Sequence, residues 1–251
     1  MQILLKVQYD GTNYSGFQRQ KNALTVQEKL EDALTLVLGC KITVTAASRT
    51  DAGVHALGQM VCFYAKKTLV PIAKLPHVIN AHLPPDISVV GSREVPESFN
   101  PRFDAKYKTY TYNFFCASFP NPLKNRHSVF VPGQLDIESM SVAAGFFIGK
   151  HDFAAFCATG SSQKTTVREV YACKCEAFHD GTVTMTITGS GFLYNMVRII
   201  AGTLYYVGIG KIPTFSLPEI ILSGQRTRAG KTMPPRGLIL VEVGYSGCQN
   251  V

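Results

Sequence analysis

The chain contains 251 residues, of which 46% are apolar and 17% charged, and its formal net charge is +8. This balance excludes disorder by composition, which requires low hydrophobicity together with high net charge. It also excludes a membrane span, because no apolar run approaches the roughly 18 to 20 residues that cross a bilayer. The most apolar segment, residues 191–210, contains Asn195 and Arg198.

At roughly 150 residues per domain, the length fits one large domain or two modest ones. The surplus of Lys and Arg indicates a polyanionic partner. The seven cysteines are scattered without CxxC pairs, so the sequence indicates neither a disulfide framework nor a zinc site. The N-terminus lacks the apolar core of a signal peptide, and a cytoplasmic location is expected for this reduced, cysteine-containing chain.

The first half of the chain alternates strand and helix patterns. Residues 1–10 predict a strand that ends at the turn pair Asp10-Gly11. A capping-box spacing from Thr25 to Glu28 begins a helix whose apolar face recurs until Gly39. The elements expected next are strands at about 42–48 and 57–65, a weaker helix at 71–82 and a strand at 87–95.

The second half repeats these kinds of element. Aromatic and β-branched residues predict a strand over 107–115, and the domain boundary is expected near residue 104. The remaining elements are a helix at about 137–148, strands near 167–178 and 182–189, a long helix from about 192 and a strand at 238–245. Without strict βαβ spacing, this order favours an α+β fold of two similar halves, 1–104 and 105–251, over a parallel doubly wound sheet.

The most unusual short segment is residues 47–56, a charged turn between two apolar strands that contains Arg49, Asp51 and His55. An Arg two residues before an Asp shares its face if the strand extends that far. Local spacing alone favours a surface turn, in which Asp51 bonds nearby backbone amides and Gly53 supplies a positive φ. By the same reasoning, His55 on its own is interpreted as structural.

Basic residues are interleaved with aromatics and turn formers in five clusters: residues 17–21, 102–112, 124–127, 164–168 and 225–236. Each cluster taken singly is typical of a solvated loop. Together they favour RNA, because cationic loops bind phosphates and aromatic faces stack on unpaired bases. The chain has no P-loop, GxGxxG, GxSxG or HExxH motif, so neither a nucleotide cofactor nor a metal is expected.

The run from Ser48 to Ala56, which reads Ser-Arg-Thr-Asp-Ala-Gly-Val-His-Ala, resembles the signature of the tRNA pseudouridine synthase A family, in which the aspartate is catalytic. The resemblance continues in order through residues 17–20, 26–31, 99–103, 108–112, 151–153, 164–168, 191–198 and 234–238. Small departures are Phe17, Ser48 and Ile239, where many members have Trp, Gly and Tyr.

The resemblance implies the pseudouridine synthase fold, a mostly antiparallel sheet with flanking helices and an active-site cleft between the two halves. It implies isomerisation of uridine to pseudouridine at positions 38, 39 and 40 of the tRNA anticodon stem-loop, without a cofactor. The implied partners are tRNA and a second copy of the chain, since the family acts as a homodimer; no membrane is involved.

The same resemblance assigns roles to individual residues. Asp51 is expected to be the catalytic carboxylate, and Arg198 the cation that pairs with it and favours its charged form. Tyr110 is expected to stack on the flipped uracil, with Tyr107 as the rival if the register is shifted. The other residues expected to bind substrate are Arg49, which occupies the space of the flipped base, Leu238 beneath the base, and the phosphate-binding residues Arg19, Lys164 and Arg168.

Two other functions fit parts of the sequence. One is a catalytically silent RNA-binding protein, against which the intact set of Asp51, Tyr110 and Arg198 argues. The other is a carboxylate-based glycosidase or nucleosidase, which needs a second acid roughly 5 to 10 Å from the first. No Glu or Asp stands in the matched segments 108–112, 191–198 and 234–238, which contain the other proposed active-site residues, and release of free uracil would favour this alternative.

Overall fold

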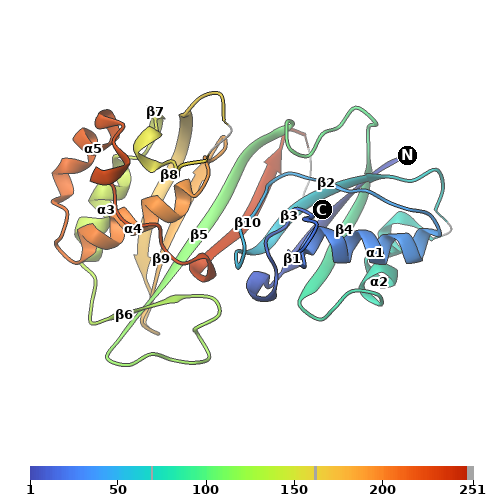
Figure 1. The fold of residues 1–251 in the computed structure, drawn as a ribbon, viewed down its shortest axis with the longest axis horizontal. Coiled ribbons are helices and arrows are strands. Elements are labelled where there is room, and N and C mark those ends of the chain that lie inside the picture. The colour runs from blue at the N-terminus through green and yellow to red at the C-terminus, as the bar shows by residue number, and fades with distance from the viewer. Residues whose placement is uncertain (69, 161–162, 248–251) are drawn as a thin grey trace. The chain divides into compact units, whose positions relative to one another are not determined.

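The computed structural model describes residues 1–68, 70–160 and 163–247. They fall into two compact units (Figure 1): unit 1 comprises residues 1–106 and 239–251, and unit 2 comprises residues 107–238. Each unit is a largely antiparallel sheet with helices packed on it, so the α+β class is confirmed. The C-terminal strand, which the sequence pattern groups with the second half, belongs to unit 1 from Ile239 onward.

The strands of unit 1 follow the order β4-β1-β3-β10, and the short strand β2 also pairs with β3. All these pairings are antiparallel except that of β10 with β3, where Ile239 lies opposite His55. The elements are β1 (Gln2–Tyr9), α1 (Val26–Leu38), β2 (Thr45–Ala46), β3 (His55–Tyr64), α2 (Leu75–Asn80), β4 (Ile87–Val95) and β10 (Leu238–Tyr245).

Helix α1 has the ends that its sequence predicts. Thr25 is extended, and its hydroxyl accepts a hydrogen bond from the Glu28 amide at 3.3 Å. Gly39 ends the helix in the left-handed conformation, with φ of 67°, which glycine adopts without steric cost. Between these caps, Val26, Leu30 and Leu34 are fully buried in the core of unit 1.

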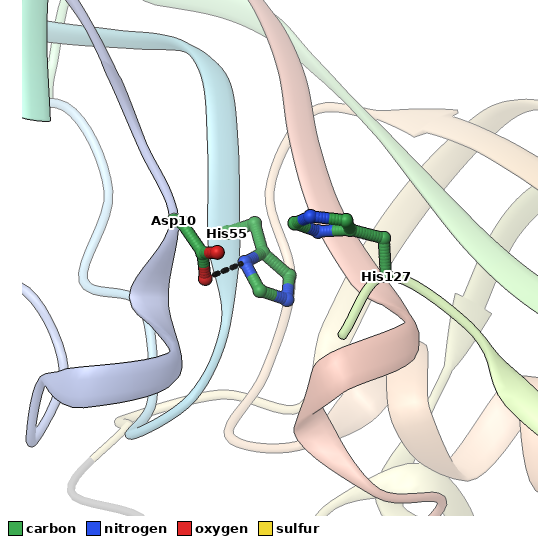
Figure 2. A group of neighbouring side chains, drawn as sticks. All are labelled: Asp10, His55 and His127. Carbon is green, nitrogen blue, oxygen red and sulfur yellow. Dashed lines mark ion pairs between the residues drawn. The ribbon is translucent and has the colours of Figure 1, made fainter. Parts of the chain in front are cut away.

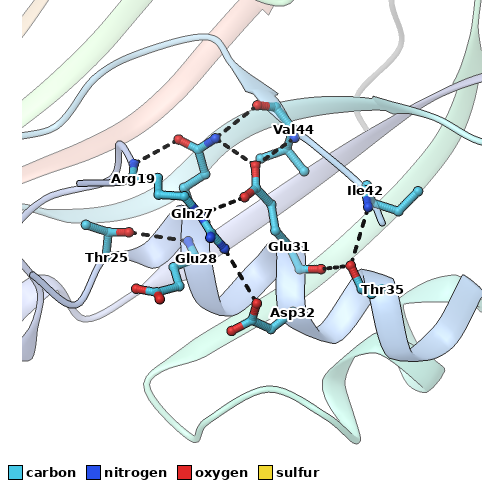
Figure 3. A network of polar contacts seen from close by, with 9 residues as sticks. All are labelled: Arg19, Thr25, Gln27, Glu28, Glu31, Asp32, Thr35, Ile42 and Val44. Carbon is cyan, nitrogen blue, oxygen red and sulfur yellow. Dashed lines mark hydrogen bonds and ion pairs between the residues drawn. The ribbon is translucent and has the colours of Figure 1, made fainter. Parts of the chain in front are cut away.

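The strand expected over 42–48 is much shorter, because helix α1 takes its backbone hydrogen bonds (Figure 3). The amide of Val44 donates to the Glu31 carboxylate at 3.1 Å, and the amide of Ile42 donates to the Thr35 hydroxyl at 3.4 Å. Glu31 is 6% exposed and also accepts a hydrogen bond from Gln27 at 2.8 Å. Only Thr45 and Ala46 remain to pair with β3.

The strands of unit 2 follow the order β5-β9-β8-β7, and β6 pairs with β5 in parallel. Helix α3 packs on β8 and on α4. The elements are β5 (Ala105–Ala117), β6 (Val129–Pro132), α3 (Ile137–Gly145), β7 (Gly149–Asp152), β8 (Val167–Ala177), β9 (Thr182–Gly189), α4 (Met196–Gly208) and α5 (Leu217–Ser223).

Helix α4 and the segment 226–237 are packed backbone to backbone. A Cβ atom on Gly202 of α4 would lie 1.8 Å from the carbonyl oxygen of Lys231. Beside it, the buried hydroxyl of Thr203 accepts a hydrogen bond from the Gly230 amide at 2.8 Å. The segment is therefore a fixed strap across α4. Among the described residues, no helix has the length and apolarity of a membrane span.

Candidate active site

Asp51 lies in the loop that joins β2 to β3. Strand β2 ends at Ala46 and β3 begins at His55, so Arg49 and Asp51 do not share a strand face. Asp51 is half-buried and Arg49 is exposed. The Val54 amide donates to the Asp51 carbonyl oxygen at 3.1 Å, and Gly53 has the positive φ, 76°, that its place in the turn predicts.

The loop is held by buried hydrogen bonds on the N-terminal side of Asp51. The side chain of Gln59, fully buried in β3, accepts a hydrogen bond from the Ser48 amide at 3.2 Å and donates to the Ser48 carbonyl at 2.7 Å. The hydroxyls of Tyr9 and Thr50 lie 2.8 Å apart, and the Thr50 carbonyl accepts from the Phe17 amide at 3.1 Å. The residues on either side of Arg49 thus have fixed positions.

The segment after β1 packs against the same loop. A Cβ atom on Gly11 would lie 2.0 Å from the Val54 carbonyl oxygen, and one on Gly16, where φ is +91°, would lie 2.5 Å from that of Thr50. Both positions therefore require glycine. These close approaches support the loop from its other side, and a carboxylate on such a loop keeps a defined position.

His55 has a structural position at the start of β3 (Figure 2). Its ring is buried, and Nδ1 lies 3.1 Å from an oxygen of Asp10 at the end of β1. The Gly11 amide lies 3.1 Å from the same nitrogen and donates to it when Nδ1 has no proton, whereas a protonated Nδ1 donates to Asp10 instead. These contacts tie the ends of β1 and β3 together beside the Asp51 loop.

In unit 2, Tyr110 and Tyr112 lie on the buried face of β5. Alternate residues of a strand share a face, and Tyr110, Tyr112 and Phe114 are all buried. The Tyr110 ring packs edge-on against Phe192, with ring centroids 5.3 Å apart. Tyr107, three positions before Tyr110, has the opposite parity and lies on the other face.

Arg198 is in the first turn of α4 and is half-buried. Its Nε donates to the Met233 carbonyl at 2.7 Å, and its Nη1 donates to the Asn195 side chain at 2.7 Å. The Met233 amide in turn donates to the Arg198 carbonyl at 3.2 Å. Arg198 is thus joined to the strap by both its side chain and its backbone.

Tyr112 connects this arrangement to Leu238. Its hydroxyl donates to the Pro234 carbonyl at 2.7 Å, and a Cβ atom on Gly237 would lie 2.6 Å from its ring. Burial raises the pKa of Tyr112 well above its usual range, although the nearby guanidinium groups of Arg198 and Arg236 oppose the shift. Leu238, directly after Gly237, is buried, so Tyr112 holds the end of the strap that carries it.

The predicted phosphate-binding residues differ in their surroundings. Arg19 lies 3.0 Å from Glu31 and 3.5 Å from Asp32, so its charge is balanced within unit 1 (Figure 3). Arg168 donates to the Thr165 and Val167 carbonyls at 2.9 and 2.7 Å. Lys164 is exposed. The structure therefore gives Arg19 and Arg168 contacts within the chain, while Arg49 and Lys164 extend into solvent.

Sequence reasoning did not single out Gln59, Asn195 or Tyr112, each of which fixes a predicted site residue or its neighbour. Gln59 left a signal, since it is a polar residue within the apolar run Ala56–Phe63. Asn195 left a weaker one, as an amide directly before a helix. Tyr112 left one as well, because its two-residue spacing from Tyr110 places both rings on one strand face.

Comparison with known proteins adds a family to this geometry. The sequence profile described as tRNA pseudouridine synthase matches residues 6–104 and 143–246. A tRNA pseudouridine synthase A from Ruminiclostridium cellulolyticum is 46% identical over 97% of this chain and 99% of its own length. The enzymes of the same name from Acetivibrio thermocellus and Geotalea uraniireducens are each 47% identical, with the same coverage.

One solved structure, an archaeal box H/ACA sRNP Nop10-Cbf5 complex, superposes on this chain at 11% sequence identity and a TM-score of 0.38. The match covers 81% of this chain and 44% of the chain in the complex. That similarity is too weak to support an inference. The profile covers parts of both units but not residues 105–142, which include Tyr110 and Tyr112, and the relatives align over 97% of the chain. The chain belongs to the tRNA pseudouridine synthase family, whose members are isomerases.

Proposed function

We propose that this chain isomerises uridine to pseudouridine at positions 38, 39 and 40 of the tRNA anticodon stem-loop, with Asp51 as the catalytic carboxylate. The observation that carries the proposal is the loop of Asp51, which buried bonds from Gln59 and Tyr9 hold within a chain of this family. A fixed carboxylate suits a reaction in which one group must meet a flipped nucleotide in a single orientation.

The reaction cuts the bond between uracil N1 and ribose C1′, turns the base and joins C5 to C1′. The C5 proton is lost and N1 gains one, so the product has the composition of the substrate. Asp51 begins the reaction either by attacking the sugar or base or by taking the C2′ proton. Arg198 is proposed as the cation paired with this carboxylate, which favours the ionised form that either route needs.

Tyr110, and not Tyr107, is proposed as the tyrosine that stacks on the flipped uracil. Tyr110 shares a strand face with Tyr112, whose pKa Arg198 influences, whereas Tyr107 lies on the opposite face. Leu238, which directly follows the Gly237 that packs on the Tyr112 ring, is proposed to pack beneath the base. Arg49, exposed two residues before Asp51, is proposed to fill the space that the flipped base leaves.

The family and the charge support a tRNA substrate. A net charge of +8 suits a phosphate backbone. The proposed phosphate contacts are the exposed Lys164, Arg168, which also bonds backbone carbonyls, and Arg19, whose charge Glu31 and Asp32 balance. We further propose that the enzyme works as a homodimer in the cytoplasm. Sedimentation of the active enzyme tests the dimer, and a fully active monomer would contradict it.

The test of the proposal is tritium release from a tRNA transcript labelled at uridine C5. Wild-type enzyme is compared with Asp51→Asn, which keeps the shape and removes the charge, and with Asp32→Asn, an exposed carboxylate of the same unit. We expect release by the wild type and by Asp32→Asn, and none above background by Asp51→Asn. A filter-binding assay should show that Asp51→Asn still binds tRNA.

Each other outcome has a distinct meaning. Release by Asp51→Asn at the wild-type rate would remove Asp51 from the chemistry. Binding of tRNA by the wild type without any release would overturn the isomerase and leave an RNA-binding protein. Release of free uracil would favour the glycosidase.

A further inference from the structure

The first turn of α4 departs from the usual rules of helix termini at three neighbouring points. Asn195 occupies the N-cap position with φ of 59° and ψ of 6°, and among the described residues it alone has a positive φ without being glycine. Its side chain makes no capping bond to the helix amides. An ordinary N-cap Asn is extended, and its capping bond stabilises the helix.

The third departure is Arg198 itself. It is the third residue of α4, where the partial positive charge of the helix N-terminus disfavours a cation. No acidic residue stands in this first turn to offset it. Local preferences broken together at one place are expected where function requires them.

The Asn195 side chain bonds to Arg198 in place of the helix amides. Its side-chain oxygen accepts from Arg198 Nη1 at 2.7 Å, and the Met233 carbonyl accepts from Nε of the same guanidinium at 2.7 Å. Because the guanidinium is planar and its donors have fixed directions, two such bonds define its plane. Glycine would satisfy the left-handed backbone more readily than Asn, so the backbone alone does not explain an amide at this position.

We propose that Asn195 is a positioning residue, which gives up its capping bond so that its amide holds the Arg198 guanidinium in the orientation that catalysis requires. This inference rests on the proposed function, since it assumes that Arg198 acts in the reaction. Met233, on the strap, supplies the second fixed point through its backbone and therefore depends on no side chain. The bond from Arg198 to Asn195, in contrast, is made by a side chain, so a substitution of Asn195 can remove it.

The test combines Asn195→Gly with Arg198→Ala and measures kcat and KM for pseudouridine formation in a tRNA transcript. Glycine keeps the left-handed backbone and removes only the amide. We expect Asn195→Gly alone to lower kcat by about ten- to a hundredfold, as small misplacements of catalytic groups do, with KM almost unchanged. In the Arg198→Ala background the same change should have no further effect on kcat, because the residue through which Asn195 acts is gone.

Two more variants keep the inference falsifiable. Asn195→Asp keeps an acceptor oxygen and tolerates the left-handed backbone, so it should retain more of kcat than Asn195→Gly. Asn121→Gly makes the same change in a turn of the same unit, where the side chain accepts from the Leu123 amide at 2.9 Å, and should leave kcat unchanged.

The inference fails if Asn195→Gly has the kcat of the wild type, or if it loses the same factor with and without Arg198. It also fails if Asn195→Asp is no more active than Asn195→Gly. The proposed function fails separately, if the wild-type enzyme forms no pseudouridine. If Arg198→Ala turns over like the wild type, the role of Arg198 fails, and that of Asn195 with it.

Discussion

At the scale of single residues, the position of Asp51 depends on side chains that cannot themselves react with uridine. Gln59 is the clearest example, because its amide group makes both a donor and an acceptor bond to the backbone of Ser48. Glu31 similarly fixes the segment before the loop, because its carboxylate accepts a hydrogen bond from the Val44 amide. Buried polar groups that bind backbone in this way give a loop one conformation.

Gln59→Leu is expected to destabilise the enzyme and to lower turnover. Leucine removes both buried hydrogen bonds that Gln59 makes to the Ser48 backbone, which costs about 2 kcal/mol or more in the free energy of unfolding. Urea unfolding measures the loss of stability. The matched control is Gln8→Leu, because the hydrogen bond from Gln8 to the Leu57 carbonyl is exposed to solvent. The free energy of unfolding of this control should change by almost nothing. Equal stability of the two variants would show that the Gln59 bonds do not hold the loop.

At the scale of elements, the contact between α4 and the strap fixes the positions of Arg198, Met233 and Leu238 within unit 2. It depends on Gly202 and Gly230, where two backbones meet without side chains between them. Thr203 and Tyr112 then add hydrogen bonds to the strap at Gly230 and Pro234.

Gly202→Ala should therefore destabilise unit 2 strongly, although alanine favours a helix by about 1 kcal/mol over glycine. The new Cβ atom would lie 1.8 Å from a backbone oxygen that cannot rotate away. Gly145→Ala, at the end of α3, meets nothing within 4 Å and should leave the melting temperature unchanged or raise it. A Gly202→Ala enzyme that melts like the wild type would contradict the close packing.

The periodic elements could be predicted from sequence, and the elements that depend on distant partners could not. The strands β4 and β10 and the caps of α1 have their predicted positions, because alternation and capping are local signals. The strand expected at 42–48 is shorter because Glu31 and Thr35 take its amides. The long helix expected from about 192 begins at Met196 because Asn195 is left-handed.

Strands β6 and β7 and helix α5 were not predicted, since they have four, four and seven residues and little periodicity. In the site, the motif around Asp51 identified the loop, but the bonds from Gln59 and the orientation of Arg198 by Asn195 depend on residues brought together only in the folded chain. The hydrogen-bond partners of Arg19 and Arg168 could not be predicted either, because the sequence does not show which carboxylates or carbonyls a basic residue contacts in the folded chain.

At the scale of the whole molecule, buried thiols couple stability to alkaline pH. Burial raises the pKa of Cys62 from 9.0 to about 11 and that of Cys175 from 9.0 to about 12. Between pH 9 and these values, the unfolded chain has lost thiol protons that the folded chain keeps. Stability therefore falls as pH rises through this window.

We expect the contribution of these two thiols to the free energy of unfolding to be constant below pH 9 and to fall from pH 9 to 11. The double variant Cys62→Ala, Cys175→Ala should fall less steeply than the wild type, measured by urea unfolding at each pH. Cys40→Ala, at an exposed cysteine, is the control and should follow the wild type. Identical slopes for all three proteins would show that the buried thiols do not contribute.

Formation of pseudouridine by the enzyme, and its dependence on Asp51, are tested most directly by the nucleoside content of treated tRNA. A transcript with uridine at positions 38 to 40 is incubated with wild-type enzyme or with Asp51→Asn, digested to nucleosides and separated by chromatography. The account predicts that wild-type enzyme replaces uridine at these positions with pseudouridine, in equal amount and without free uracil, and that Asp51→Asn leaves the uridine intact. Free uracil, or pseudouridine formed equally by Asp51→Asn, would contradict it.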